Sequence, residues 1–118
     1  ASDVYKRQVL CYPFFSEEEY VKRVKELEKL GIREILSFGD VKIGQWKILG
    51  KGHVGVVVLA IMDNQKVVVK IRRVDADREN LIREAEIIKK ANNIGIGPKL
   101  LKYSKNFIVM VFLRRVWN

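Results

Sequence analysis

The chain has few of the residues and runs that mark several protein classes. Its single cysteine, Cys11, cannot form an internal disulfide, which fits a reducing compartment, and we expect it to pack as a small buried side chain. The longest apolar runs, residues 55–62 and 107–113, are far shorter than the about 20 residues that span a bilayer. No segment has the pattern of a secretory signal. We therefore expect a soluble, cytoplasmic protein with no membrane association.

The sequence is rich in positive charge but has no purely basic block. It contains 23 Lys and Arg against 14 Asp and Glu, for a net charge of +9. Acidic residues interrupt the basic ones in residues 17–33 and again in 75–90, a pattern typical of solvated helix faces. A dedicated nucleic-acid surface is therefore the less favoured interpretation, and a small basic RNA-binding module stays the alternative.

The 118 residues are enough for one small domain. Residues 1–8, ASDVYKRQ, have no apolar period and resemble the in-frame translation of a transposase-type sequencing adapter; a disordered native N-terminus is the alternative. Residues 9–40 are expected to form an N-terminal helical extension. Ser16 and Glu19 have the spacing of a capping box and Gly31 is a stop signal, so we predict a helix over residues 16–30.

Strand-like segments flank three glycines in the middle of the chain. Residues 41–50 and 55–62 lie on either side of the glycines, and residues 66–73 follow after Asp63-Asn64, which suits a tight reversal. These three segments predict consecutive antiparallel strands.

The third of these strands carries a lysine in a β-branched run. Alternation places Val68 and Lys70 on one face, opposite the face of Val67, Val69 and Ile71. Lys70 therefore needs surroundings that tolerate charge. Either an exposed strand face or a functional site would supply them.

A second helix is predicted over residues 75–92, beginning at Asp75 or Asp77. Its apolar stripe is Leu81, Ala85 and Ile88, and Glu84 borders that stripe, so this carboxylate should face the protein body and pair with a cation. Two further strands are expected near residues 99–103 and 107–113, after a Gly-Pro break.

The order of these elements excludes two common phosphate-binding motifs. A Rossmann site needs a helix after its glycines, whereas a strand follows here. A Walker A loop needs G-K-[ST], which His53-Val54 does not supply. The remaining scheme is G-x-G-x-x-G-x-V, then a strand lysine, then a helix glutamate.

On these motifs, residues from about 45 to 113 resemble the N-terminal lobe of a protein-kinase-like enzyme. They are most similar to archaeal predicted serine/threonine kinases near the RIO-type and tRNA-modification-complex kinase families. Gly50, Gly52, Gly55 and Val57 match the glycine-rich loop, Lys70 matches the strand lysine, Glu84 matches the helix glutamate, and Met110 falls at the gatekeeper before a hinge over residues 111–113.

The resemblance implies an α+β fold: a five-stranded antiparallel sheet with one regulatory-type helix over residues 41–113, plus the N-terminal helix. It implies ATP as ligand and Mg²⁺ as its partner ion, with Lys70 and Glu84 as catalytic residues. The cofactor-binding residues it implies are Gly50, Gly52, Val54, Gly55, Val57, Val68, Lys70, Met110, Val111 and Leu113. No metal ligand is expected in this part, and His53 at the loop tip is expected to be exposed rather than catalytic.

Three features depart from the family pattern, one of which is Val111, at a hinge position where many kinases carry an acid. Val68 replaces the common alanine beside the adenine, and the chain contains no H-R-D, D-F-G or A-P-E element. Residues 114–118 are taken as a truncated end, so this chain should be an ATP-binding fragment, inactive alone, of a serine/threonine kinase-like phosphotransferase. A non-catalytic nucleotide-binding (pseudokinase) domain is an alternative. The partners that the resemblance implies for this chain are its own missing C-lobe and a phosphoryl acceptor, either a protein or a tRNA-linked complex.

The gene itself offers a test. A longer reading frame should continue past Leu113 into a mostly helical segment with an H-x-D loop, an Asn about five residues after that Asp, and then D-x-G. Upstream, it should replace ASDVYKRQ with unrelated residues. Sequencing of the intact locus decides this; a native stop codon directly after Asn118 would favour the binding-module interpretation.

Overall fold

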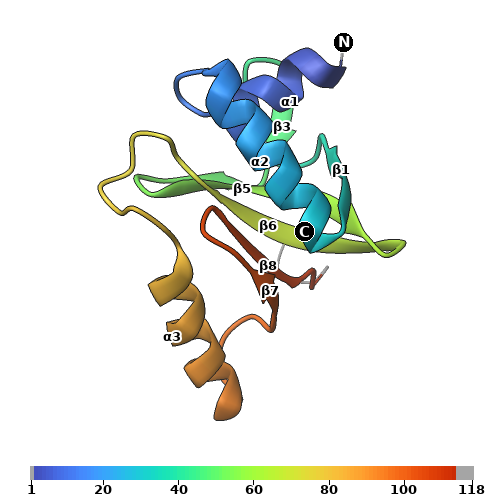
Figure 1. The fold of residues 1–118 in the computed structure, drawn as a ribbon. Helices are drawn as coiled ribbons and strands as arrows, with labels where there is room; N and C mark the ends of the chain where they lie inside the picture. Colours follow the sequence, from blue (N-terminus) through green and yellow to red (C-terminus); the bar gives the residue numbers. More distant parts are fainter. Residues whose placement is uncertain (1, 114–118) are drawn as a thin grey trace.

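The structure is a computed structural model that describes residues 2–113, with side chains from residue 6 onward. Residues 114–118, expected to be a truncated end, lie outside the described residues. The helices and strands are, in chain order, α1 (Ser2–Leu10), α2 (Glu17–Leu30), β1 (Ile32–Leu36), β2 (Val41–Ile43), β3 (Trp46–Ile48), β4 (Gly50–Lys51), β5 (Gly55–Met62), β6 (Gln65–Arg72), α3 (Ile82–Asn93), β7 (Leu100–Tyr103) and β8 (Phe107–Val111) (Figure 1).

The main sheet is antiparallel with the order β1-β5-β6-β8-β7, and β4 also pairs with β5. The expected α+β class is therefore confirmed, but within residues 2–113 this sheet has six strands rather than five. Residues 32–36, assigned from the sequence to a helical extension, add β1 beside β5.

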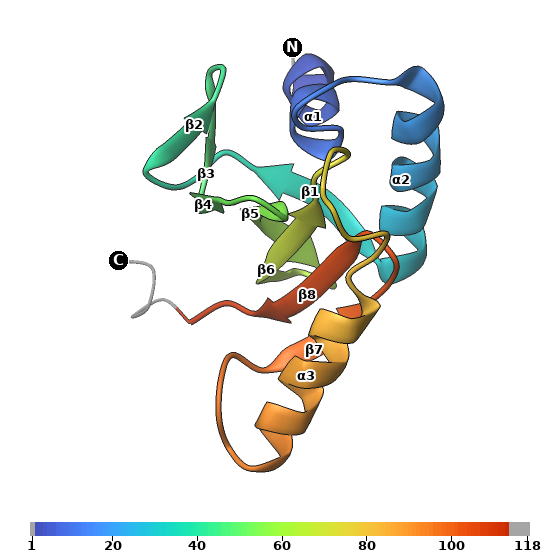
Figure 2. The ribbon, with the colours of Figure 1, turned by 90° about the vertical axis from the view of Figure 1, so that its left-hand side faces the viewer.

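Residues 41–48 also differ from the single long strand that was expected. They fold back on themselves as the separate β2–β3 hairpin, which stands apart from the main sheet in Figure 2. The reversal follows Ile43, where Gly44 has a φ of +59° that side chains rarely adopt. Only the short β4 is left to pair with β5 ahead of the glycine turn.

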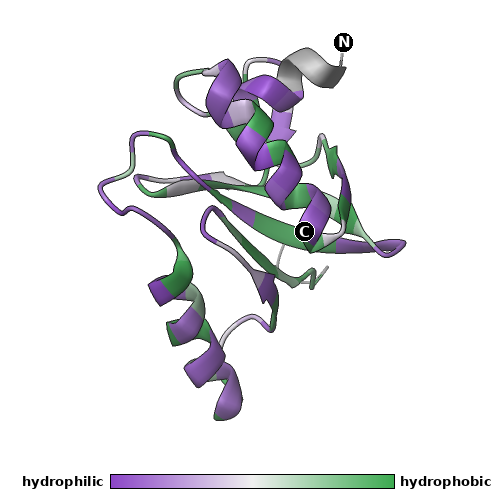
Figure 3. Ribbon diagram, viewed as in Figure 1, coloured by the Kyte–Doolittle hydropathy of each residue, from purple (hydrophilic) through white to green (hydrophobic). Residues whose placement is uncertain are grey.

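Helices cover the two faces of the main sheet unequally. The larger hydrophobic core lies on the side of α1 and α2, where Leu10 and Leu27 join inward residues of β5, β6 and β8, such as Val58, Val69 and Phe107. The smaller cluster lies on the side of α3 (Figures 1 and 2). The central strands are mostly hydrophobic in Figure 3, with hydrophilic segments at the end of the β5–β6 hairpin and on β6.

Helix α2 forms as its sequence predicts. The Ser16 side chain accepts a hydrogen bond from the Glu19 N–H at 3.3 Å, and Gly31 ends the helix in the left-handed region at φ +85°. The turn at Asp63-Asn64 is also confirmed, since both residues have positive φ and join β5 to β6.

Helix α3 begins at Ile82, not at Asp75 or Asp77 as expected. Asp75 does not cap a helix, because its carboxylate accepts two hydrogen bonds from the Arg73 guanidinium, at 2.8 and 2.9 Å. Residues 75–80 instead form an irregular connection, and the Asn80 side chain accepts from the Ile82 N–H at 3.0 Å. The expected start at Asp75 is therefore wrong because the Asp75 carboxylate binds the Arg73 side chain instead of capping the helix.

The N-terminal segment is part of the fold. Residues 2–8, interpreted from the sequence as part of an adapter-like or disordered segment, belong to α1 in the structure, and Val9, Leu10 and Cys11 are almost completely buried. Burial raises the pKa of the Cys11 thiol, in agreement with its expected role as a small buried side chain. No helix among residues 2–113 is both long and apolar enough to cross a bilayer.

A fully buried arginine joins α2 to the sheet. Arg23, at 0% exposure, donates to Glu19 at 2.8 Å and to the backbone oxygens of Leu10 and Arg72. Its guanidinium also reaches the Asn106 side chain at 3.5 Å. One side chain therefore ties α1, α2, the end of β6 and the β7–β8 turn together.

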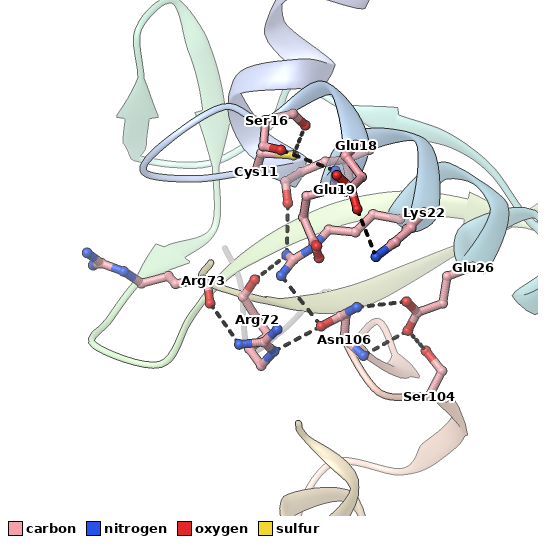
Figure 4. A network of polar contacts seen from close by, with 12 residues as sticks. Cys11, Ser16, Glu18, Glu19, Lys22, Glu26, Arg72, Arg73, Ser104 and Asn106 are labelled. Carbon is pink, nitrogen blue, oxygen red and sulfur yellow. Dashed lines mark hydrogen bonds and ion pairs between the residues drawn. The ribbon is translucent and has the colours of Figure 1, made fainter. Parts of the chain in front are cut away.

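Asn106 is the second centre of this network. Its backbone N–H and its side-chain amide each donate to Glu26 of α2, both at 2.8 Å, and Ser104 also donates to that carboxylate (Figure 4). The side-chain oxygen of Asn106 accepts a hydrogen bond from Nε of Arg72 at 2.9 Å. The buried polar groups of this network are thus hydrogen-bonded, which is the condition for burying them without a large penalty.

Replacing Arg23 should be far more damaging than replacing its neighbour. Arg23→Met should lower the free energy of unfolding by about 3 kcal/mol or more, because it leaves a carboxylate and two carbonyl oxygens without their donor. Lys22→Met, on the same helix with an exposed ion pair to Glu18, should change it by less than about 1 kcal/mol. Chemical denaturation of both variants checks this, and equal losses would contradict the role given to Arg23.

The ion pair between Arg23 and Glu19 predicts that stability depends on pH in the acid range. The hydrogen bond from Arg23 holds the pKa of Glu19 below its ordinary value. The stabilisation is therefore complete above the ordinary glutamate pKa and is lost as the pH falls through the lowered one. Glu19→Gln should be less stable than the parent at neutral pH, and the difference should shrink as the pH is lowered. Thermal midpoints against pH measure it; a constant difference would count against this origin.

Candidate functional site

The candidate site lies on the sheet face that α3 covers. Alternation along β6 sends Val69 into the larger core and places Val68 and Lys70 on the opposite face, as predicted. Lys70 lies directly opposite Val57 of β5 and Ile108 of β8. It is thus an amine on the middle strand of a mainly apolar face.

Lys70 pairs with the glutamate that the sequence singled out. Its Nζ donates to Glu84 Oε2 at 2.7 Å, and both side chains are mostly buried, with 21% and 24% exposed. The other oxygen of Glu84 lies 3.4 Å from the more exposed Arg78. The sequence-based orientation of α3 is confirmed, since Glu84 faces the sheet more than the exposed Glu86 does.

Packing of α3 fixes this pair. Leu81 and Ala85, both at 0% exposure, contact Ile108 of β8, and the Leu81 N–H donates to the Lys105 oxygen at 2.8 Å. Glu84 lies between these two residues along the helix and is held over β6. The ion pair therefore rests on an apolar contact that is itself buried.

An apolar cavity of about 380 Å³ lies on the same sheet face. It is lined by Val57, Val68, Met110, Val111, Leu113, Gly97 and Pro98. The first five are residues implied by the kinase resemblance, and register explains their meeting, because Val68 lies opposite Met110 in the sheet. Gly97 and Pro98 were noted from the sequence only as a break between elements.

The cavity and the ion pair meet at Val57, which lines the cavity and lies opposite Lys70. The site thus has an apolar part and a charged part on adjacent positions of β5 and β6. Among residues 2–113, no three or more His, Cys, Asp or Glu side chains gather as a metal site would require.

The glycine turn connects β4 to β5 above this face. The Gly52 N–H donates to the Gly55 oxygen at 2.9 Å, and the Leu49 N–H donates to the Val57 oxygen at 2.8 Å. A Cβ at Gly55 would lie 2.6 Å from the Ile71 oxygen and 3.2 Å from Lys70 Cε. Gly55 is therefore required by the fold itself, because it lets β6 and the lysine stem pass close beneath the turn.

The other two glycines have no such requirement. A Cβ at Gly50 would meet nothing within 4 Å, and one at Gly52 would meet only the Gly55 oxygen, at 3.9 Å. Neither has the positive φ that excludes side chains. The space beside them is open, so the fold itself does not require glycine at either position.

The tip of the turn differs from the expectation in one respect. His53 is exposed, as predicted. Val54 packs against the cluster of Leu81, Ala85 and Ile108 and does not line the apolar cavity. Its side chain supports the turn from the α3 side.

The glycines should respond differently to the same small substitution. Gly55→Ala should lower the free energy of unfolding by about 1–3 kcal/mol, because the Ile71 backbone oxygen cannot move aside without disturbing the sheet. Gly50→Ala should leave stability unchanged or raise it by up to about 1 kcal/mol, since the space is open. Denaturation curves of the two variants decide, and equal effects would contradict this division.

Comparison of the chain with models of known protein families and with curated proteins gave no match.

Proposed function

We propose that residues 41–113 form the ATP-binding lobe of a serine/threonine protein-kinase-like phosphotransferase. The observation that carries the proposal is the Lys70–Glu84 ion pair, at 2.7 Å, beside an apolar cavity and beneath a glycine turn. An amine, an apolar slot and a glycine turn with open space beside it are features that suit a nucleoside triphosphate.

The apolar cavity is the place for the adenine ring. Its volume of about 380 Å³ lies in the range of small-molecule sites, and its lining from Val57, Val68 and Met110 suits a flat aromatic ring. The Val111 N–H already donates to the Lys99 oxygen at 2.9 Å. The ring's polar edge would therefore be bound by other backbone groups of the hinge, up to Leu113.

Lys70 is placed to bind the α- and β-phosphates. Val57, at the cavity, lies opposite Lys70, so a ligand whose base fills the cavity would extend its phosphates toward the amine. Glu84 fixes the direction of the flexible lysine side chain and compensates its charge in a mostly buried place. Gly50 and Gly52 leave the turn open to phosphate oxygens.

The proposal assigns the transfer chemistry to a second lobe. A catalytic base and the Mg²⁺ ligands would come from that lobe, and the acceptor would be a protein or a tRNA-linked complex. Ile87, Ile94, Ile96 and Leu113, each at least half exposed, give the α3 side apolar surface of the kind that a second lobe would cover. A nucleotide-binding domain without catalysis would use the same first lobe.

One observation favours RNA binding as a second candidate. Lys42 and Lys47 lie directly opposite each other on the β2–β3 hairpin, and both are exposed. Like charges in this position destabilise a strand pair, so an anionic ligand would relieve the repulsion. Affinity for RNA that falls steeply with salt, with no binding of ATP, would replace the kinase proposal by this one.

The central test compares two lysines of one strand. In a longer chain that includes the second lobe, Lys70→Ala should lower kcat about a hundredfold or more while the fold survives, because a phosphate-binding charge is lost. Lys66→Ala, an exposed lysine on the same strand, should leave kcat unchanged. Equal turnover of parent and Lys70→Ala would contradict the role given to Lys70.

The 118-residue chain alone should bind an ATP analogue weakly and transfer no phosphoryl group, since half of the cleft is absent. Titration with a fluorescent ATP analogue measures the affinity, and Val68→Trp, which fills the cavity, should abolish it. Undiminished binding by Val68→Trp would place the ligand elsewhere.

A further inference from the structure

Arg73, one residue past the end of β6, holds the glycine turn from outside the site. Its Nη1 donates to the Gly52 oxygen at 3.0 Å, and its backbone N–H donates to the Val54 oxygen at 2.8 Å. Two consecutive residues thus serve two different sites: Arg72 turns toward Asn106 in the buried network, whereas Arg73 points away from it (Figure 4).

The Arg73 side chain is fixed before it reaches the turn. Its Nε and Nη2 donate to the two oxygens of Asp75, at 2.8 and 2.9 Å, and its side chain is only 21% exposed. The bidentate pair sets the plane of the guanidinium, so that the remaining nitrogen, Nη1, is aimed at Gly52. These hydrogen bonds also hold the pKa of Asp75 below its ordinary value, which keeps the carboxylate charged.

The connection between α1 and α2 forms the back of this arrangement. The Arg73 guanidinium lies over the Tyr12 ring, 5.1 Å from its centroid, and the Lys51 ammonium of β4 lies 5.7 Å from the same ring. The backbone carbonyl oxygen of Tyr12 accepts a hydrogen bond from the Val74 N–H at 3.0 Å. Tyr12, far from the turn in sequence, therefore contacts two cations, Lys51 on β4 and Arg73 after β6.

We propose that Arg73, oriented by Asp75 and backed by Tyr12, is a positioning residue for the glycine turn, so that the N-terminal helical segment sets the turn's place over the nucleotide site. The proposal rests on the proposed function for its consequence in nucleotide binding. An exposed glycine-rich turn loses much conformational freedom when it is fixed, and a preformed hydrogen bond from a held side chain reduces what a ligand must supply.

Only an arginine can do this. Its planar fork donates to Asp75 through two nitrogens and still has one for Gly52, whereas a lysine at this position would keep the charge and the contact with Tyr12 but lose the fixed geometry. The variant Arg73→Lys therefore tests whether the positive charge alone is enough or whether the planar guanidinium with its three hydrogen bonds is needed.

Hydrogen exchange on the 118-residue chain tests the positioning role without any ligand. In Arg73→Gln, exchange of the Gly52 amide, which donates to Gly55, should become about tenfold faster, while the amides of β8 keep their parent rates. Arg73→Lys should resemble Arg73→Gln, and Asp75→Asn should show a smaller change in the same direction. Arg33→Gln, which removes an exposed arginine contact to Asn64 far along the chain, is the matched control and should change nothing at the turn.

Parent-like exchange at Gly52 in Arg73→Gln would overturn the proposal. So would parent-like exchange in Arg73→Lys, because charge alone would then suffice. If Arg73→Gln unfolds, Asp75→Asn and Tyr12→Leu, compared with Tyr12→Phe, decide the same question, since only Tyr12→Leu removes the ring from beneath the guanidinium.

Titration with an ATP analogue then separates this proposal from the proposed function. If the parent binds the analogue, Arg73→Gln should weaken binding about threefold to tenfold through the less ordered turn, and unchanged affinity would overturn the link to the site. If the parent binds no nucleotide, the proposed function fails, while the exchange rates still decide whether Arg73 positions the turn.

Discussion

The alternation of the β6 side chains between the two faces of the sheet is the constraint on which the rest of the structure depends. This strand lies between β5 and β8, with both edges hydrogen-bonded, so its side chains must go to one face or the other. Val67, Val69 and Ile71 enter the larger core, and Val68 and Lys70 are left for the face under α3. The charge of Lys70 can be placed there only because α3 brings Glu84 within 2.7 Å of it.

The two ends of β6 serve different purposes. Toward its N-terminal half, Val68 lies opposite Met110 and helps to line the apolar cavity. At its C-terminal end, the side chains of Arg72, the last residue of the strand, and Arg73, the next residue, diverge, the first to Asn106 and the second to Asp75 and Gly52. Residues of β6 and the arginine after it therefore contact the N-terminal helices, the candidate site and the glycine turn.

The buried network around Arg23 explains why the N-terminal helices belong to this domain. Arg23 hydrogen-bonds to Glu19 on its own helix and reaches the end of β6 and the β7–β8 turn. A buried guanidinium is costly unless its donors are satisfied, and here its partners come from four parts of the chain. The helical segment and the sheet therefore depend on each other, because the buried guanidinium of Arg23 needs hydrogen-bond acceptors from both.

The sequence by itself determined the features that depend on near neighbours along the chain. The capping of α2 by Ser16, its end at Gly31, the tight turn at Asp63-Asn64 and the alternation of β6 all follow from residues within a few positions of each other. The pairing of Lys70 with Glu84 was also predictable, because the order of motifs, together with the family resemblance, placed a strand lysine and a helix glutamate in reach.

Tertiary structure decided what depends on distant partners. Three features were not predicted: β1 pairs with β5, β2 and β3 form a separate hairpin, and α3 begins late. Each depends on which of several possible partners a segment contacts in the folded chain, and the local sequence does not show which one is preferred. Arg23 and Asn106 are 83 positions apart, and Arg73 and Gly52 are 21 apart. A lone arginine in a charged helix gives no signal that it will be buried, because its burial depends on acceptors that only the folded chain brings around it.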